Sequence, residues 1–255
     1  MSSRIFCLRG SLFCAYKESF HSFFLVPFYS AIVFYVRFVR RYKIKNKHKI
    51  RKQFRGFLKK EHKGPVLICA NHLSYFDAFG IIWGLGSLWG YLRHFRRFPW
   101  NIPNAKFACA NLFNRLMSYM GKMIPLKTEG GGSNAKTVLR RVTHLLKRGD
   151  FAMIFPEGTR SETGRLNMDD YGYGAGQILQ AVPQAKVLLI YLRGEEDKMQ
   201  RYLPQKGCQF YMKLKWFAPQ TQTNQQGRQG IRELSKKIME ELCEMEKEYF
   251  QEIPS

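Results

Sequence analysis

The chain has 255 residues, of which 42 are lysine or arginine and 19 are aspartate or glutamate, giving a formal net charge of +23. This length suits one sizeable domain with appendages, and so large a charge predicts an anionic partner. The 6 cysteines are scattered without a C-x-x-C spacing, which argues against a disulfide framework or zinc site and favours a reducing compartment.

The first long apolar stretch runs from Phe20 to Val36, is rich in aromatic residues and contains Pro27 near its middle. Its length is near the lower limit for a membrane-spanning helix, and a proline would kink a helix at this point. Three arrangements remain open: a single short span, a bent hairpin embedded in one leaflet, and a buried core helix. A cleaved signal peptide is disfavoured, because the next residues are strongly basic and no small-residue cleavage site follows.

The segment from Arg37 to Lys60 carries many lysines and arginines and no acidic residue. Basic residues beside an apolar stretch favour the cytoplasmic side of a membrane, and each contributes roughly 1 kcal/mol near anionic headgroups. Nucleic-acid binding is the competing interpretation. The adjacent apolar segment favours membrane, so we expect anionic membrane lipids as partners and no nucleic acid. Residues 1–62 are therefore predicted to be an N-terminal, membrane-associating region.

The first predicted core strand is Val66–Ala70, a short apolar run preceded by a Gly-Pro pair. His72 follows it, and Asp77 stands five residues later. In one continuous helix, five residues turn the chain by about 140° beyond a full circle, so these side chains would not share a face. They can meet only if His72 lies in a turn and Asp77 in the next helix. The alternative is a satisfied core histidine and an ordinary helix-start aspartate. Ser74 is interpreted as a helix-start cap and not as a nucleophile.

Periodicity predicts further elements along the rest of the chain. Residues 104–120 have the pattern of a helix, and residues 187–192 form a short apolar run typical of a core strand. Alternation over residues 212–216 predicts a strand with one solvated face, and apolar residues recurring from 231 to 245 predict a final amphipathic helix. We expect residues 63–222 to form the main domain and residues 223–255 a C-terminal amphipathic helix.

A second motif follows another short apolar run, residues 151–155, and reads Pro-Glu-Gly-Thr-Arg-Ser over residues 156–161. Together, the N-H-x-x-x-x-D motif of residues 71–77 and the FPEGTRS motif of residues 155–161 resemble the glycerolipid acyltransferase family, whose bacterial type member acylates lysophosphatidic acid. The order, the separation and the apolar run before each motif also match that family. Residues 121–127 resemble the family's middle motif, with Lys127 at the position of an arginine.

The resemblance implies an α/β fold, a mixed sheet flanked by helices, with the active site at the strand ends. It implies an O-acyltransferase of phospholipid biosynthesis that uses acyl-CoA or acyl-carrier protein as donor, without a cofactor or metal. His72 is expected to be the general base, oriented by Asp77. A backbone N–H near the start of the helix after His72 is our hypothesis for the oxyanion hole. The residues expected to bind the acceptor are Glu157, Gly158, Thr159, Arg160 and Lys127.

Lysophosphatidic acid is the expected acceptor, with another lysophospholipid or a lyso-aminolipid as alternatives. The headgroup stays open because residues 171–174 read YGYG where many family members have a Phe-Lys-x-Gly pattern. Two rivals come from other classes: a non-catalytic basic membrane-binding protein of the same fold, and a nucleic-acid binder. The expected location is the cytoplasmic face of a membrane, with the bacterial inner membrane favoured over others.

Overall fold

A computed structural model of the chain describes residues 24–60, 64–127, 133–161, 163–195, 203–218 and 227–252. A 6-stranded sheet forms its centre, in the order β1-β6-β5-β2-β4-β3. The strands are β1 (Lys43–Ile44), β2 (Val66–Ala70), β3 (Trp100–Asn101), β4 (Phe151–Ile154), β5 (Lys186–Gly194) and β6 (Gln209–Phe217). The β5–β6 pair is antiparallel and the other pairs are parallel, which confirms the predicted mixed sheet.

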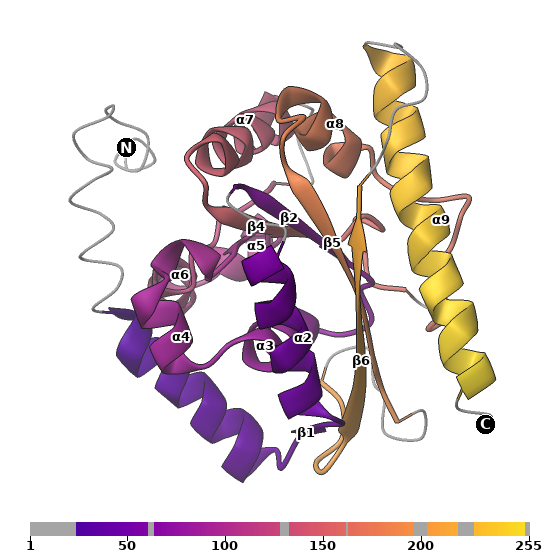
Figure 1. Cartoon of the computed structure of the whole chain (residues 1–255). Coiled ribbons are helices and arrows are strands. Elements are labelled where there is room, and N and C mark those ends of the chain that lie inside the picture. The colour runs from indigo at the N-terminus through magenta and orange to yellow at the C-terminus, as the bar shows by residue number, and fades with distance from the viewer. Residues whose placement is uncertain are drawn as a thin grey trace.

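Helices cover both faces of this sheet (Figure 1). On one side lie α2 (Lys47–Lys60), α3 (Asp77–Leu85), α4 (Leu88–Arg93), α5 (Ala105–Ala108) and α6 (Leu112–Met120). On the other side lie α7 (Ser133–Lys147), α8 (Gly174–Ala181) and α9 (Arg228–Glu252), the last being the predicted amphipathic helix. The described helical elements also include residues 24–34, a π-helical turn (Tyr35–Val39) that follows them, and a 3₁₀ turn (Phe95–Arg97).

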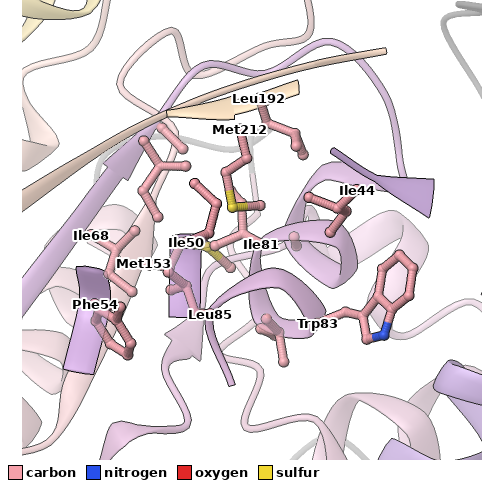
Figure 2. Packing of buried hydrophobic residues seen from close by; sticks show 14 of the residues in the cluster. Ile44, Ile50, Phe54, Ile68, Ile81, Trp83, Leu85, Met153, Leu192 and Met212 are labelled. Carbon is pink, nitrogen blue, oxygen red and sulfur yellow. The ribbon is translucent and has the colours of Figure 1, made fainter. Parts of the chain in front are cut away.

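Two hydrophobic cores result, because successive side chains of a strand point to opposite faces of the sheet. From β2, Ile68 enters the core beneath α2 and α3, whereas Leu67 enters the core beneath α7, α8 and α9. Figure 2 shows the first core, where Ile50 and Phe54 of α2 meet Ile81 of α3 and the strand residues. β2 is buried over its whole length, so the segment that leads to His72 is held on both faces.

The N-terminal apolar stretch is described from residue 24 onward, and its first residues lie outside the described part. Residues 24–34 are helical, and one side of this helix is packed: Phe28 meets Phe98 edge-on at 6.5 Å, and the Tyr29 hydroxyl donates to the Gly86 carbonyl at 2.9 Å. Phe34 at the end of this helix and Phe38 in the π-helical turn that follows it are exposed. Among the described helices, none combines the length and apolar character that crossing a bilayer requires.

The basic segment that follows is built into the sheet and its core. β1 pairs with β6 at the edge of the sheet, and α2 buries Ile50, Phe54 and Leu58, which recur at a spacing of four residues. The Arg51 side chain donates to the Trp83 carbonyl at 2.8 Å, at the carboxyl end of α3, where a cation is favourable. Part of the charge between residues 37 and 60 therefore has a structural role beside any contact with lipid.

The single helix predicted over residues 104–120 is wrong, because the structure contains two helices there. α5 ends at Ala108, and α6 begins at Leu112. Asn104 and Asn111 each accept a backbone N–H through Oδ1, from Lys106 and Asn114 respectively, both at 2.8 Å. An asparagine at position 111 can cap a new helix as readily as it can continue an old one, and here the cap prevails.

Candidate active site

The two motifs meet at the carboxyl ends of two neighbouring parallel strands. β2 and β4 are paired with Cys69 beside Ile154, so the turn after β2 lies next to the loop after β4. His72 stands in that turn and Asp77 is the first residue of α3, as the spacing predicts. Parallel strands deliver the residues that follow them to one edge of the sheet, which explains why motifs far apart in sequence share a site.

The Asp77 carboxylate organises the turn. Its Oδ2 atom accepts the backbone N–H groups of Leu73 at 2.6 Å and Ser74 at 2.7 Å, and its Oδ1 atom accepts the Ser74 hydroxyl at 2.8 Å. Oδ2 also lies 2.9 Å from His72 Nδ1, and the Asp77 side chain is only 2% exposed. A carboxylate with these partners stays in place and accepts from the histidine with fixed geometry.

The His72 ring is oriented on two sides. Because Nδ1 is directed at a carboxylate, it carries the proton, and Nε2 carries the lone pair. The ring stacks on Phe155 of the neighbouring loop, with centroids 4.2 Å apart and an interplanar angle of 19°. The side chain is 21% exposed, so it remains accessible to a reactant. An accessible imidazole with an acceptor nitrogen and a paired carboxylate can act as a general base.

The loop after β4 grips the backbone of His72. Glu157 Oε1 accepts the His72 N–H at 2.6 Å, and the Ser161 N–H donates to the His72 carbonyl at 2.9 Å. Asn71 anchors the preceding residue, because its side chain exchanges two hydrogen bonds with the backbone of Leu192 in β5. His72 is therefore positioned from both adjacent strands. Glu157 orients this part of the site through the His72 backbone.

The environment of Glu157 is unusual for a carboxyl group. Burial raises its pKa from 4.5 to about 8; the His72 N–H opposes this shift, and the charges of Asp77 and Glu246 add to it. The side chain is thus uncharged over much of the neutral range, and its carbonyl oxygen can still accept the His72 N–H. A neutral Glu157 also spares the site a second negative charge beside Asp77.

Arg160 lies over the Tyr75 ring, with its guanidinium carbon 3.8 Å from the ring centroid. Tyr75 belongs to the turn between His72 and Asp77, so this stacking ties the two motifs together on their outer side. Gly158, at φ +71°, takes a left-handed conformation that suits glycine, and it and Thr159 are exposed. These residues present an exposed backbone next to a cation that stacks on the turn between His72 and Asp77.

Lys127 lies farther along the same edge of the sheet. It is exposed and follows Leu126, which forms an isolated bridge with Asn104 beyond β3. Three strand spacings separate this segment from β2, roughly 14 Å at about 4.8 Å each. Lys127 therefore lies away from the atoms next to His72.

Several features of the site escaped the sequence analysis. The stacking of Phe155 and Tyr75 and the Ser161 N–H contact depend on which strands are neighbours, which neither motif reveals alone. Ser74 was expected to cap α3, but its hydroxyl donates to Asp77 and accepts from Phe76 N within the turn. The Leu73 and Ser74 N–H groups also bind Asp77, so neither is available as the proposed oxyanion hole.

Two comparisons with known proteins cover the part of the chain that contains this site. Residues 41–190, which contain both motifs, match the family described as Acyltransferase. The chain is also similar to the chloroplastic 1-acyl-sn-glycerol-3-phosphate acyltransferase LPAT1 of Arabidopsis thaliana, with 34% identity over 102 residues. That match covers 40% of this chain and 25% of the plant protein, so the chain spans about a quarter of its relative's length.

Proposed function

The chain belongs to the Acyltransferase family, and from this premise we propose that it transfers a fatty acyl group from a thioester to the free hydroxyl of a lysophospholipid. Lysophosphatidic acid is the acceptor that we favour, with other lysophospholipids or a lyso-aminolipid as alternatives. The contact between His72 Nδ1 and Asp77 Oδ2 at 2.9 Å carries the proposal, because it leaves Nε2 as an accessible base.

The reaction that follows from this geometry is a direct transfer. His72 Nε2 takes the proton of the acceptor hydroxyl while the hydroxyl oxygen bonds to the thioester carbonyl carbon. The tetrahedral intermediate then breaks its carbon–sulfur bond, and the imidazolium returns the proton to the departing thiolate. The Asp77 carboxylate stabilises the imidazolium between these two steps. Ser74, the hydroxyl nearest to the histidine in sequence, is buried and bonded to Asp77, which supports the acceptor itself as the nucleophile.

We propose that Arg160 binds the anionic headgroup of the acceptor. A guanidinium can hold a phosphate through paired hydrogen bonds, and stacking on Tyr75 limits the orientations of the side chain. The exposed Gly158–Thr159 backbone lets the headgroup approach closely. Lys127 adds a second positive charge farther from the reacting hydroxyl, where the headgroup of the acceptor or the phosphates of the donor would pass.

The donor in this proposal is acyl-CoA or acyl-carrier protein, and the lipid substrates place the protein at a membrane. We propose the cytoplasmic face of that membrane, the bacterial inner membrane above others, with anionic lipids as partners. The many cations from Arg37 to Lys60, with no acidic residue among them, support this location.

The test is a panel assay with the full chain. Purified protein is mixed with radiolabelled acyl-CoA or acyl-carrier protein and with vesicles that contain one lysolipid at a time. We expect a labelled diacyl product, largest with lysophosphatidic acid. His72→Ala purified in parallel should form it at least about 10²-fold more slowly, which excludes a contaminant. If no lysolipid of the panel is acylated with either donor, the catalytic proposal is contradicted. Vesicle binding retained without acylation would favour the non-catalytic membrane-binding protein.

A further inference from the structure

An exposed apolar surface covers α5 and α6, which Figure 1 shows on the side of the sheet opposite α9. We define this surface, the α5–α6 face, by Phe107, Leu112, Phe113 and Leu116, which are 47%, 82%, 66% and 49% exposed. Leu112 and Leu116 lie one helical turn apart and share a side of α6. Met117 and Met120 pack against the core, so α6 is apolar toward the core and also toward solvent.

This face continues into the active site through two ring contacts. Phe107 stacks on Tyr75, with centroids 5.6 Å apart and an interplanar angle of 21°. The other contact is the stacking of Arg160 on Tyr75. Asn114 Nδ2 donates to the Phe107 carbonyl at 2.9 Å, which fixes α5 against α6. An unbroken row of side chains thus runs from the apolar face to the proposed headgroup-binding cation.

The charge around the face determines which occupant fits it. The sequence contains no acidic residue between Asp77 and Glu129, whereas the exposed cations Lys106 and Arg115 flank the face on α5 and α6. An apolar centre with a cationic border fits an anionic bilayer, since acyl chains accept the apolar residues and headgroups accept the cations. A second copy of the chain would bring its own +23 charge, which disfavours dimerisation through this face.

We propose that the α5–α6 face enters an anionic lipid bilayer and that its Tyr75 end passes an acceptor lipid directly to Arg160. The first part is independent of the catalytic activity, whereas the second rests on the function proposed above. The lipid headgroup then moves along the membrane surface to the guanidinium while its acyl chain stays in the apolar phase. The inference also places His72 at the level of the headgroups, where the acceptor hydroxyl lies.

Vesicle binding by the full chain tests the first part. Co-sedimentation with phosphatidylglycerol–phosphatidylcholine vesicles is measured for wild type, Leu112→Ser/Phe113→Ser and the control Tyr173→Ser/Leu203→Ser. The control also replaces two exposed apolar side chains, 44% and 37% exposed, but away from this face. Far-ultraviolet circular dichroism and thermal unfolding confirm that each variant is folded, as exposed positions allow.

We expect the partition coefficient of Leu112→Ser/Phe113→Ser to fall at least tenfold and that of the control to change less than twofold. A smaller loss in the α5–α6 variant, an equal loss in the control, or no binding by wild type would overturn the inference. So would a wild-type dimer in sedimentation that this substitution dissociates, because the face would then be covered by a second copy.

Acyl transfer to two forms of one acceptor tests the second part. With a short-chain acceptor dissolved below its critical micelle concentration, Leu112→Ser/Phe113→Ser should retain the wild-type rate within twofold. With the acceptor embedded in vesicles, its rate should fall at least tenfold. Equal losses on both acceptors would refute delivery from the bilayer. If wild type acylates neither form, the proposed function fails, while vesicle binding still decides the role of the face.

Discussion

Replacing Asp77 with asparagine separates the charge of this carboxylate from its hydrogen bonds. The amide oxygen can take the position of Oδ2, which accepts Leu73 N, Ser74 N and His72 Nδ1 at 2.6, 2.7 and 2.9 Å. The amide nitrogen then faces the Ser74 hydroxyl, which can accept a hydrogen bond. We expect the free energy of unfolding to fall by only about 1–2 kcal/mol, since neutral hydrogen bonds are weaker than charge-assisted ones but persist.

Asparagine cannot supply the negative charge that faces the imidazolium during the reaction. Two unit charges about 4 Å apart interact by about 4 kcal/mol at an effective dielectric constant of about 20. The Asp77 side chain is only 2% exposed, so water screens this interaction little. A loss of about 4 kcal/mol from the transition state corresponds to a rate about 10³-fold lower. The substitution should therefore reduce kcat far more than it reduces stability.

Initial rates of acyl transfer and urea unfolding of the same preparation measure both effects. Asp170→Asn is the matched control, because Asp170 is exposed in the loop before α8 and should leave both quantities unchanged. An Asp77→Asn rate within tenfold of wild type would refute the role of the charge. A loss of unfolding free energy as large as the loss in transition-state stabilisation would show that the turn itself had been disrupted.

Other substitutions test the surrounding groups. Because the native pKa of Glu157 is about 8 and the unfolded value is 4.5, the native state binds more protons between these values and loses stability as pH rises. Between about pH 6 and about pH 8, the free energy of unfolding of wild type, measured in urea, should fall by about 2 kcal/mol more than that of Glu157→Gln. Parallel pH profiles of the two proteins would contradict this. Arg160→Lys should raise the acceptor KM about tenfold or more with a smaller change in kcat, because the paired geometry is lost; an unchanged KM would exclude headgroup binding by Arg160. Lys122 is buried, and its Nζ atom lies 3.4 Å from Asp150 Oδ1, so Lys122→Ala should lower the free energy of unfolding in denaturant by about 3 kcal/mol. Lys127 is exposed, and Lys127→Ala should lower it by less than about 0.5 kcal/mol. Equal losses would refute the buried pair.

The local parts of the site were accessible from the sequence. The five-residue separation of His72 and Asp77, placed after an apolar run, required a strand, a turn and a helix start, and the structure has this arrangement. The strands over residues 66–70 and 151–154 were recognisable because their apolar runs are short and bounded. Local chain geometry was sufficient in both cases.

The contacts between motifs were not accessible in the same way. The Glu157 contact with the His72 N–H and the Phe155 stacking exist because β2 and β4 are neighbours in the sheet, which no pattern within either motif specifies. The position of α2 on the core was obscured by its many cations, although Ile50 and Phe54 recur at a helical spacing. Charge dominated our interpretation of that segment, whereas burial of its apolar side fixes its place in the fold.

The most direct test of the central claim is chemical rescue of His72→Ala by free imidazole, measured as the initial rate of acyl transfer. Removing the side chain takes away the base that stacks on Phe155 and faces Asp77, so the variant alone should be about 10²- to 10⁴-fold slower than wild type. Added imidazole should raise the rate of His72→Ala in proportion to the concentration of neutral imidazole. It should leave the rate of Arg160→Ala unchanged. A His72→Ala rate within tenfold of wild type without imidazole would contradict the account.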